Sequence, residues 1–223
     1  MSRRKLDKYE FSRAAENVIE RGKPLYTTIK GRWNKVYFGN DNPIALELAC
    51  GKGEYTIGLG QKFPGRNFIG VDIKGDRLAR GSKIASELGL KNVAFLRTSI
   101  KYMDEFFVEN EINDIWLVHP DPQLRERDEK RRLTNSSFLK SYLNYLKPDG
   151  SFHLKTDSFP LYVYSLETLA QSDFEIQNQT CDLYHSDLLD GHFGITTHYE
   201  RAFHSKGFAI NYIQAINKKE TSV

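Results

Sequence analysis

The sequence predicts a doubly wound α/β fold with a mostly parallel sheet. From Pro43 onward, short apolar runs typical of buried strands alternate with segments of helical periodicity, and turns separate them. This alternation indicates that each helix crosses over between two parallel strands with right-handed connections. Residues 1–42 are polar and aromatic without such periodicity. We therefore expect an N-terminal basic and aromatic arm (1–42) followed by one domain (43–223).

The first half of that domain supplies three strands and two helices. Ile44–Ala49 is an apolar strand, and the helix expected after it, ending at Lys62, is weakened by two glycines. Asn67–Val71 is the second strand. Arg77–Leu88 is typical of a helix and is stopped by a glycine, and Val93–Leu96 is the third strand.

The second half begins with the apolar strand Ile112–Val118, which is followed closely by two prolines. Leucines on one stripe make 137–146 an amphipathic helix, and Lys147–Gly150 is its expected stop. The remaining expected elements are a strand at Ser151–Lys155, a helix at Leu161–Ala170 and strands near 174–180 and 198–210.

Composition favours an ordinary globular protein of the cytoplasm. Hydrophobic residues make up 39% and charged residues 27%, and no apolar run approaches the roughly 18 residues of a membrane span. The N-terminus has no apolar core of the kind that a secretory signal requires. Cys50 and Cys181 are too few and too far apart for a disulfide framework, and we expect no metal. A net charge of +3 neither requires nor excludes a nucleic-acid partner.

The most informative stretch lies directly after the strand that ends at Val118. Pro120 and Pro122 fix the backbone around Asp121 at the carboxyl end of the strand, where open α/β sheets bind ligands. Five of the eight residues in 125–132 are Arg or Lys. Such a run alone is often a solvated surface, but a fixed carboxylate beside it favours a nucleic-acid site. A second, weaker basic cluster in the arm comprises Arg3, Arg4, Lys5 and Lys8.

A second group of residues indicates a cofactor site. Glu47 precedes a turn with Gly51 and Gly53, where glycine lets the backbone approach a ligand closely. Asp72 closes the next strand, where a carboxylate accepts hydrogen bonds from ribose hydroxyls, and Ser99 follows the third strand within reach of an adenine edge. The third glycine of a dinucleotide loop is missing, so the pattern favours S-adenosylmethionine over NAD.

Four motifs in a fixed order resemble those of the bacterial tRNA (guanine-N7-)-methyltransferases. They are ELACGKG at 47–53, HPDPQLRERDEKRRL at 119–133, KTD at 155–157 and THYE at 197–200. The resemblance implies a seven-stranded, Rossmann-like methyltransferase fold that uses S-adenosylmethionine. It also implies methyl transfer to N7 of a guanine in tRNA, at position 46 of the variable loop.

The resemblance assigns roles to individual residues. Those expected to line the cofactor site are Glu47, Gly51, Gly53, Asp72, Ser99 and Asp121, with Asp121 also catalytic. Those expected to contact the target nucleotide are Arg125, Asp157, Thr197, His198, Tyr199 and Glu200. Those expected to contact the tRNA backbone are Arg127, Lys130, Arg131 and Arg132.

The chain departs from the family pattern at several of these positions. Ala49 stands where the family has glycine, which requires a negative φ if the alanine is to be unstrained. Ser99 stands in place of the usual Asp. The positions that follow the strand differ as well: His119, Gln123, Leu124, Arg125 and Asp128 replace Phe, Trp, Pro, Lys and His.

Guanine N7 carries a lone pair and no proton, so its methylation needs no general base. We expect Asp121 to act electrostatically on the developing cation, and Asp157 or Glu200 to accept the paired donors of the guanine edge. Asp157 as a helix cap and Thr197 and Tyr199 as ordinary strand residues are the alternatives. For the whole chain, the alternatives are a small-molecule or protein methyltransferase and a non-catalytic RNA-binding module. The expected partner is tRNA, and the chain is expected to be a monomer or homodimer.

Overall fold

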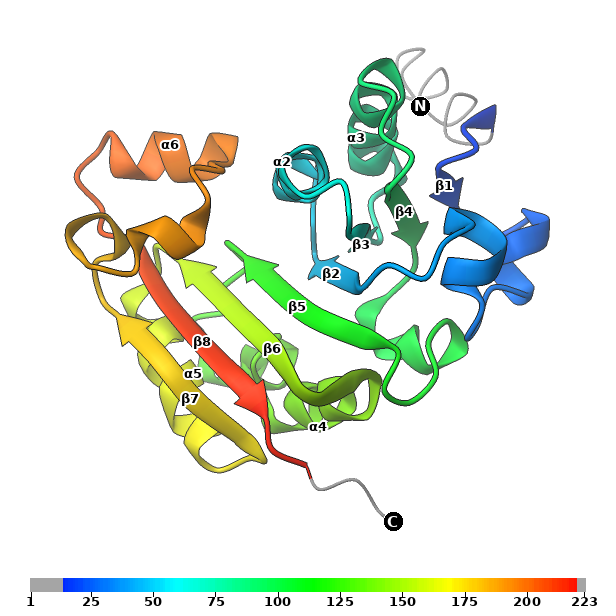
Figure 1. The fold of residues 1–223 in the computed structure, drawn as a ribbon. Helices are drawn as coiled ribbons and strands as arrows, with labels where there is room; N and C mark the ends of the chain where they lie inside the picture. The colour runs from blue at the N-terminus through cyan, green and yellow to red at the C-terminus, as the bar shows by residue number, and fades with distance from the viewer. Residues whose placement is uncertain (1–13, 220–223) are drawn as a thin grey trace. The chain divides into compact units, whose positions relative to one another are not determined.

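The computed structural model describes residues 14–219, and the chain divides into two compact units, Met1–Glu111 and Ile112–Val223. Figure 1 shows the elements of each unit. The basic residues of the arm, Arg3 to Lys8, lie outside the described residues.

Unit 1 contains four parallel strands in the order β1-β4-β3-β2. Their bounds are β1 (Val18–Ile19), β2 (Ile44–Leu48), β3 (Asn67–Asp72) and β4 (Val93–Arg97). The helices are α2 (Glu54–Lys62) and α3 (Gly75–Glu87), and the short helical turns are η1 (Pro24–Thr27), η2 (Trp33–Phe38) and η3 (Ile100–Glu105). The two-residue strand β1 comes from the segment expected to be an arm, and its pairing with β4 places that part of the segment in the sheet.

Two glycines of unit 1 allow its helices to pack closely beside Phe95. A Cβ at Gly81 of α3 would come within 2.4 Å of the Lys52 carbonyl oxygen, and one at Gly53 within 2.4 Å of the Phe95 ring. Because only glycine avoids these contacts, α3 can lie directly against the turn between β2 and α2. The glycine-rich turn is thereby held by packing from both sides.

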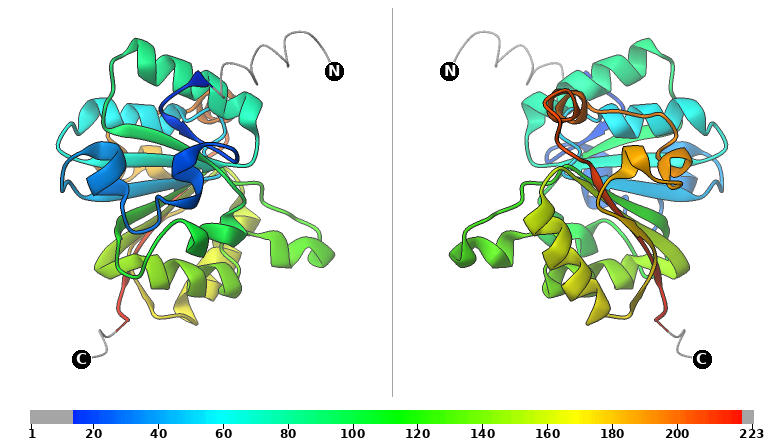
Figure 2. Two further views of the ribbon diagram at one scale, coloured as in Figure 1. Left: turned by 90° about the vertical axis from the view of Figure 1, so that its right-hand side faces the viewer. Right: turned by 90° about the vertical axis from the view of Figure 1, so that its left-hand side faces the viewer.

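Unit 2 contains the strands in the order β5-β6-β8-β7, of which β5 and β6 are parallel and the others antiparallel. Their bounds are β5 (Ile112–Val118), β6 (Leu146–Thr156), β7 (Phe174–Thr180) and β8 (Asn211–Asn217). The helices are α4 (Ser136–Tyr145), α5 (Phe159–Ala170) and α6 (His198–His204), with short turns η4 (Glu126–Arg131), η5 (Leu183–His185) and η6 (Leu189–His192). Helices α4 and α5 cover one face of the strands (Figure 2), where Tyr142 stacks on Phe152 with ring centroids 6.1 Å apart.

Most of the expected elements are present within one or two residues of their expected bounds. The strand expected near 198–210 is wrong, because residues 198–204 form helix α6 and β8 begins only at Asn211. Thr197 caps this helix, and its hydroxyl accepts a hydrogen bond from the Glu200 amide at 3.1 Å. A Thr followed three residues later by Glu is a capping-box pattern, so a local signal for this helix was present in the sequence. Among the described residues there are eight strands rather than the seven expected.

Candidate functional site

The glycine-rich turn after β2 has three residues in the left-handed conformation. The φ angles are 58° at Ala49, 57° at Gly51 and 67° at Gly53. The condition for an unstrained alanine, a negative φ at Ala49, is therefore not met, and the alanine is strained by about 1–2 kcal/mol relative to glycine. Hydrogen bonds from Cys50 N to Val71 O at 3.1 Å and from Gly53 N to Cys50 O at 2.8 Å hold this conformation. A Cβ at Gly51 would meet no atom within 4 Å, so a ligand can approach the backbone there.

Glu47 is almost completely buried, with 3% of its surface exposed. Its Oε2 accepts hydrogen bonds from the amide of Thr56, at 2.7 Å, and from the Thr56 hydroxyl. Burial raises the pKa of Glu47 to about 7, against the lowering effect of the two Thr56 bonds, and the nearby carboxylates of Asp72 and Glu54 raise it further. Among the described residues nothing donates to Oε1, so this oxygen is available to a cationic or hydroxyl-bearing ligand.

Asp72 and Ser99 end the neighbouring strands at the same edge of unit 1. The Asp72 carboxylate accepts from Gly51 N at 2.9 Å and from Lys74 N at 2.8 Å, which ties the glycine-rich turn to the end of β3. Ser99 caps η3 by accepting from Lys101 N at 3.4 Å. The predicted cofactor residues of unit 1 are thus brought together at the carboxyl ends of β2, β3 and β4.

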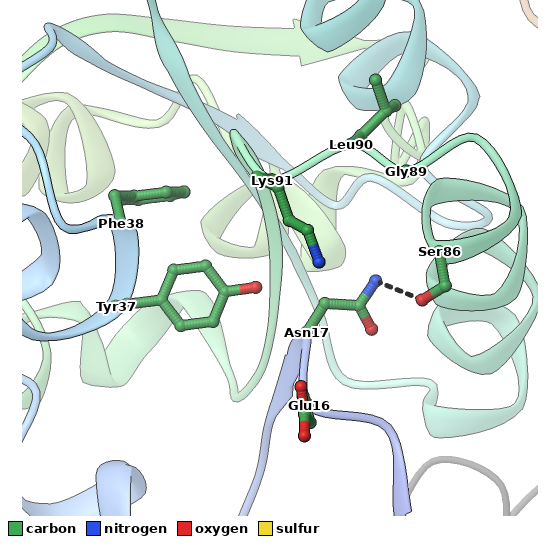
Figure 3. Close-up of a pocket in the computed structure, with 8 residues that line it drawn as sticks. All are labelled: Glu16, Asn17, Tyr37, Phe38, Ser86, Gly89, Leu90 and Lys91. Atoms are coloured by element: carbon green, nitrogen blue, oxygen red, sulfur yellow. Dashed lines mark hydrogen bonds between the residues drawn. The ribbon is translucent and has the colours of Figure 1, made fainter.

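A cavity of about 630 Å³ in unit 1 lies at the other edge of these strands (Figure 3). Its lining comes from residues just before β1, such as Asn17, and just before β4, such as Lys91. Asn17 donates to Ser86 Oγ at 3.2 Å within it. Because parallel strands share their direction, this cavity is remote from Glu47 and Asp72 and is a separate feature.

In unit 2, β5 leaves the sheet through two left-handed residues, His119 (φ 48°) and Gln123 (φ 46°). Between them Asp121 is exposed, and its Oδ1 accepts a hydrogen bond from Gln123 N at 3.1 Å. This short turn fixes the carboxylate next to the end of β5, as the flanking prolines predict. Oδ2 accepts no hydrogen bond from the described residues, so the carboxylate can act on a ligand.

Unit 2 also holds a buried cluster of charged groups, which we call the Glu200 cluster: His119, Lys155, Asp157, Tyr184, His192 and Glu200. Lys155 and Glu200 are both fully buried, and Nζ donates to both Oε1 and Oε2 at 3.0 Å. Burial raises the pKa of Glu200, but the neighbouring rings of His119 and His192 and the charge of Lys155 outweigh it and hold this pKa well below its usual range.

Two further side chains complete the shell of Glu200. The Tyr184 hydroxyl lies 2.9 Å and His192 Nε2 2.8 Å from Glu200 Oε1. Burial together with the carboxylate of Glu200 raises the pKa of Tyr184 above its usual range, so the phenol keeps its proton. With Lys155 on both oxygens as well, Glu200 has little capacity left for a ligand.

The THYE motif therefore divides into two pairs. Thr197 and Glu200 face inward, the first as the cap of α6 and the second in the buried cluster. His198 and Tyr199 point outward, and Tyr199 is 53% exposed. Figure 1 shows α6 beyond the ends of β6 and β8, so these outward residues lie at the same end as Asp157.

The basic run, residues 125–132, includes η4. Most of its cationic side chains are exposed to solvent, and one packs against the protein. Arg132 lies over the Tyr164 ring, 4.3 Å from its centroid, and donates from Nε to Gln123 O at 3.2 Å. Arg131 and Arg127 both pair with Asp128, at 3.0 and 4.0 Å, and remain exposed. Arg125 and Lys130 are also exposed. The four exposed cations suit contact with a polyanion, whereas Arg132 fixes the segment to α5.

Comparison with known proteins gives the family. A family model described as a putative methyltransferase matches residues 41–212. The tRNA (guanine-N(7)-)-methyltransferase of Bacteroides fragilis (strain YCH46) is 42% identical, over 99% of this chain and 88% of the relative. That of Christiangramia forsetii is 44% identical, over 96% of this chain and 97% of the relative. This chain belongs to the tRNA (guanine-N(7)-)-methyltransferase family.

Solved structures similar to this family member confirm the predicted fold class. The 16S rRNA methyltransferase KamB matches with a TM-score of 0.63 and 13% identity, over 84% of this chain and 93% of that one. An antibiotic-related methyltransferase also reaches 0.63, with 17% identity, over 91% of this chain and 97% of that one. At such low identity the likeness extends to the fold alone, which is the doubly wound α/β type found in methyltransferases.

Sequence reasoning missed the inner members of the Glu200 cluster, although the family motifs contain some of them. In the sequence, Lys155 is indistinguishable from any residue at the end of a strand. The spacing of His119, Tyr184 and His192 matches no metal-binding or catalytic motif. Within residues 14–219 no group of three His, Cys, Asp or Glu side chains is arranged to hold a metal ion. Nor does any helix in that range combine the length and apolarity needed to cross a bilayer.

Proposed function

We propose that this chain transfers a methyl group from S-adenosylmethionine to N7 of a guanine in tRNA, in the variable loop. The observation that carries the proposal is the 42% identity to a tRNA (guanine-N(7)-)-methyltransferase over 99% of the chain. The four motifs lie within this match. Two of them contribute Asp121 and Asp157, whose carboxylates are not fully buried and can therefore contact a substrate. We further propose that the protein acts in the cytoplasm, where tRNA is matured.

The residues of unit 1 fit S-adenosylmethionine. Glu47 has one unpartnered carboxylate oxygen for an ammonium group, and Asp72 stands at the end of the next strand, where ribose hydroxyls are bound in such folds. Gly51 leaves open space for the ligand to approach the backbone. When bound, this cofactor supplies an electrophilic methyl group on a sulfonium. Ser99 would lie toward the adenine, where the family has Asp.

The residues of unit 2 would act on the nucleotide. Because N7 has no proton, none of them needs to serve as a general base, and positioning with electrostatic stabilisation is sufficient. Asp121, fixed by its turn, would stabilise the positive charge that develops on the imidazole ring. Asp157 rather than Glu200 would accept the guanine N1–H and N2–H, since the oxygens of Glu200 are already taken by other donors.

The exposed part of the basic run would contact the tRNA backbone. Arg127, Lys130 and Arg131 would meet phosphates, and Arg125 would lie nearest the target nucleotide, because it is closest in sequence to Asp121. Tyr199 and His198 on α6 offer exposed rings for stacking on a base.

Incubation with labelled S-adenosylmethionine and unmodified tRNA, followed by nucleoside analysis, tests the proposal. We expect 7-methylguanosine as the labelled product and its loss in Asp121→Asn. Labelling of small molecules or protein but not tRNA would replace the proposal with another methyltransferase activity. Binding of tRNA without any cofactor binding would point to a non-catalytic RNA-binding role.

A further inference from the structure

His119 occupies an unusual position between two carboxylates that come from two different motifs. Its side chain is 6% exposed, and Nδ1 lies 3.0 Å from Asp157 Oδ1. On the other side of the ring, Nε2 lies 3.5 Å from Glu200 Oε2. The backbone at His119 is left-handed, with φ 48°, while its amide still donates to Lys155 O at 2.8 Å. The strained backbone is thus maintained by the sheet on one side and by the cluster on the other.

The geometry identifies where the protons of this ring reside. The hydrogen bond from His119 lowers the pKa of Asp157, against the effect of its partial burial, so the carboxylate is ionised and Nδ1 carries the donated proton. Nε2 is buried and has no hydrogen-bond partner among the described residues. In a neutral ring its lone pair would face a carboxylate oxygen, which is repulsive, whereas a proton on Nε2 would be attracted to it. The imidazolium form is therefore favoured.

The charges around the ring lead to the same protonation state. Lys155 on β6 and Glu200 on α6 neutralise each other, because one ammonium contacts both carboxylate oxygens. Tyr184 from η5 and His192 from η6 contact Glu200 and add hydrogen-bond donors. The Asp157 carboxylate, which follows β6, has a positive charge beside it in this cluster only if His119 is protonated. Burial lowers the pKa of His119 and the charge of Lys155 also opposes protonation, but the two carboxylates raise this pKa above its usual value.

We propose that His119 acts as a charged positioning residue, which holds Asp157 Oδ1 so that Oδ2 and the remaining lone pairs face the target base. This inference rests on the proposed function of the site. Asp157 is suited to the role because 24% of its side chain remains exposed while one oxygen is fixed. The family pattern has Phe at position 119, which cannot donate to a carboxylate. A charged His119 would make the methylation of tRNA depend on pH.

The first test measures kcat/KM for tRNA between pH 5.5 and 8.5 at saturating cofactor. The native protein should lose activity as the pH rises through the folded-state pKa of His119. His119→Gln, whose amide donates without titrating, should lack this alkaline loss, and His119→Phe should be lower by about tenfold at pH 6.5. His185→Gln is the matched control, because the His185 ring is exposed and pairs with Asp182 rather than with a carboxylate of the Glu200 cluster. Cofactor affinity should not change in any of the three variants.

The second test does not depend on activity. Histidine NMR titration of the free protein, assigned with His119→Gln, should give a midpoint for His119 above the ordinary value of about 6.5. Asp157→Asn should lower that midpoint, because it removes the nearer carboxylate. A midpoint at or below the ordinary value, unchanged in Asp157→Asn, overturns the inference even if the enzyme is active.

The two tests separate failure of this inference from failure of the proposed function. If neither the native protein nor any variant methylates tRNA, the proposed function fails. The NMR midpoint still shows whether the two carboxylates keep His119 protonated. If the native protein methylates tRNA but His119→Gln and His119→Phe keep both its rate and its pH profile, the positioning role is refuted while the function stands. Thermal melting of each variant verifies folding before comparison.

Discussion

Replacing Lys155 with methionine keeps an unbranched side chain that ends one atom short of the ammonium and removes its charge, and it should destabilise the protein strongly. Lys155 and Glu200 are both fully buried, and the ammonium lies 3.0 Å from each carboxylate oxygen. Removing one partner of such a pair typically costs about 3–5 kcal/mol, because the other charge is left in a medium of low dielectric constant. Glu200 retains donors from Tyr184 and His192 in this variant, so we expect about 3 kcal/mol, the lower end of the range.

Equilibrium urea unfolding followed by circular dichroism measures this loss. Lys83→Met is the matched control, since Lys83 pairs with Glu87 at 3.7 Å while both side chains are more than 60% exposed. That exposed pair should contribute less than about 0.5 kcal/mol. Lys155→Met combined with Glu200→Gln should be less unstable than the sum of the two single variants, because no buried charge is then left uncompensated.

The pH dependence of the difference in unfolding free energy between the native protein and Lys155→Met provides an internal check. Glu200 has a lowered pKa in the folded protein, so its contribution to stability is present above the unfolded value of about 4.5 and is lost as the pH falls below it. The deficit of Lys155→Met should accordingly be largest near neutral pH and shrink in acid. A Lys155→Met protein within about 1 kcal/mol of native stability at pH 7 would refute the reasoning.

Three further predictions concern ligands. Glu47→Gln and Asp72→Asn should each weaken cofactor binding by about ten- to a hundredfold in calorimetric titration while tRNA binding survives; unchanged affinity in both would remove these residues from the cofactor site. Asp121→Asn should lower the single-turnover methylation rate by about two to three decades with little change in tRNA affinity, and a near-native rate would make Asp121 structural only. Arg131→Ala should reduce the slope of log affinity for tRNA against log salt by somewhat under one unit. Arg132→Ala, which removes the cation over Tyr164, should instead lower stability by about 1 kcal/mol, and equal slopes in the two variants would contradict this division.

The elements of the fold could be predicted where the signal is local and periodic. Strands β2 to β6 and helices α2 to α5 each follow from an apolar run or a helical stripe with a recognisable stop. Helix α6 was missed because the alternation of residues in 197–200 was given more weight than the capping-box pattern. For the left-handed Ala49 the residue itself gave no signal, and only the glycine at this position of the family pattern pointed to a positive φ.

The candidate site was predictable as a set of motifs but not as a set of contacts. His119 meets Asp157 across 38 positions of the chain, and Lys155 meets Glu200 across 45. Such pairs depend on strand order and on where α6 begins, which no local pattern contains. The sequence also gives no sign that Lys155 and Glu200 are buried, because Lys and Glu are among the residues least often found inside a protein. Sequence reasoning therefore treated Asp157 and Glu200 as equivalent candidates for reading the base.

Burial separates these two carboxylates and suggests how guanine would be distinguished from adenine. Glu200 is saturated by buried donors, whereas Asp157 has one oxygen bound to His119 and keeps 24% of its side chain exposed. The same hydrogen bond lowers the pKa of Asp157, so this carboxylate stays ionised at neutral pH. It therefore accepts hydrogen bonds and donates none. Guanine presents N1–H and N2–H as neighbouring donors, while adenine presents a bare N1 lone pair, which an ionised carboxylate repels. Selection of guanine would then depend on how the ionised Asp157 carboxylate is oriented, which is the role that we propose for His119.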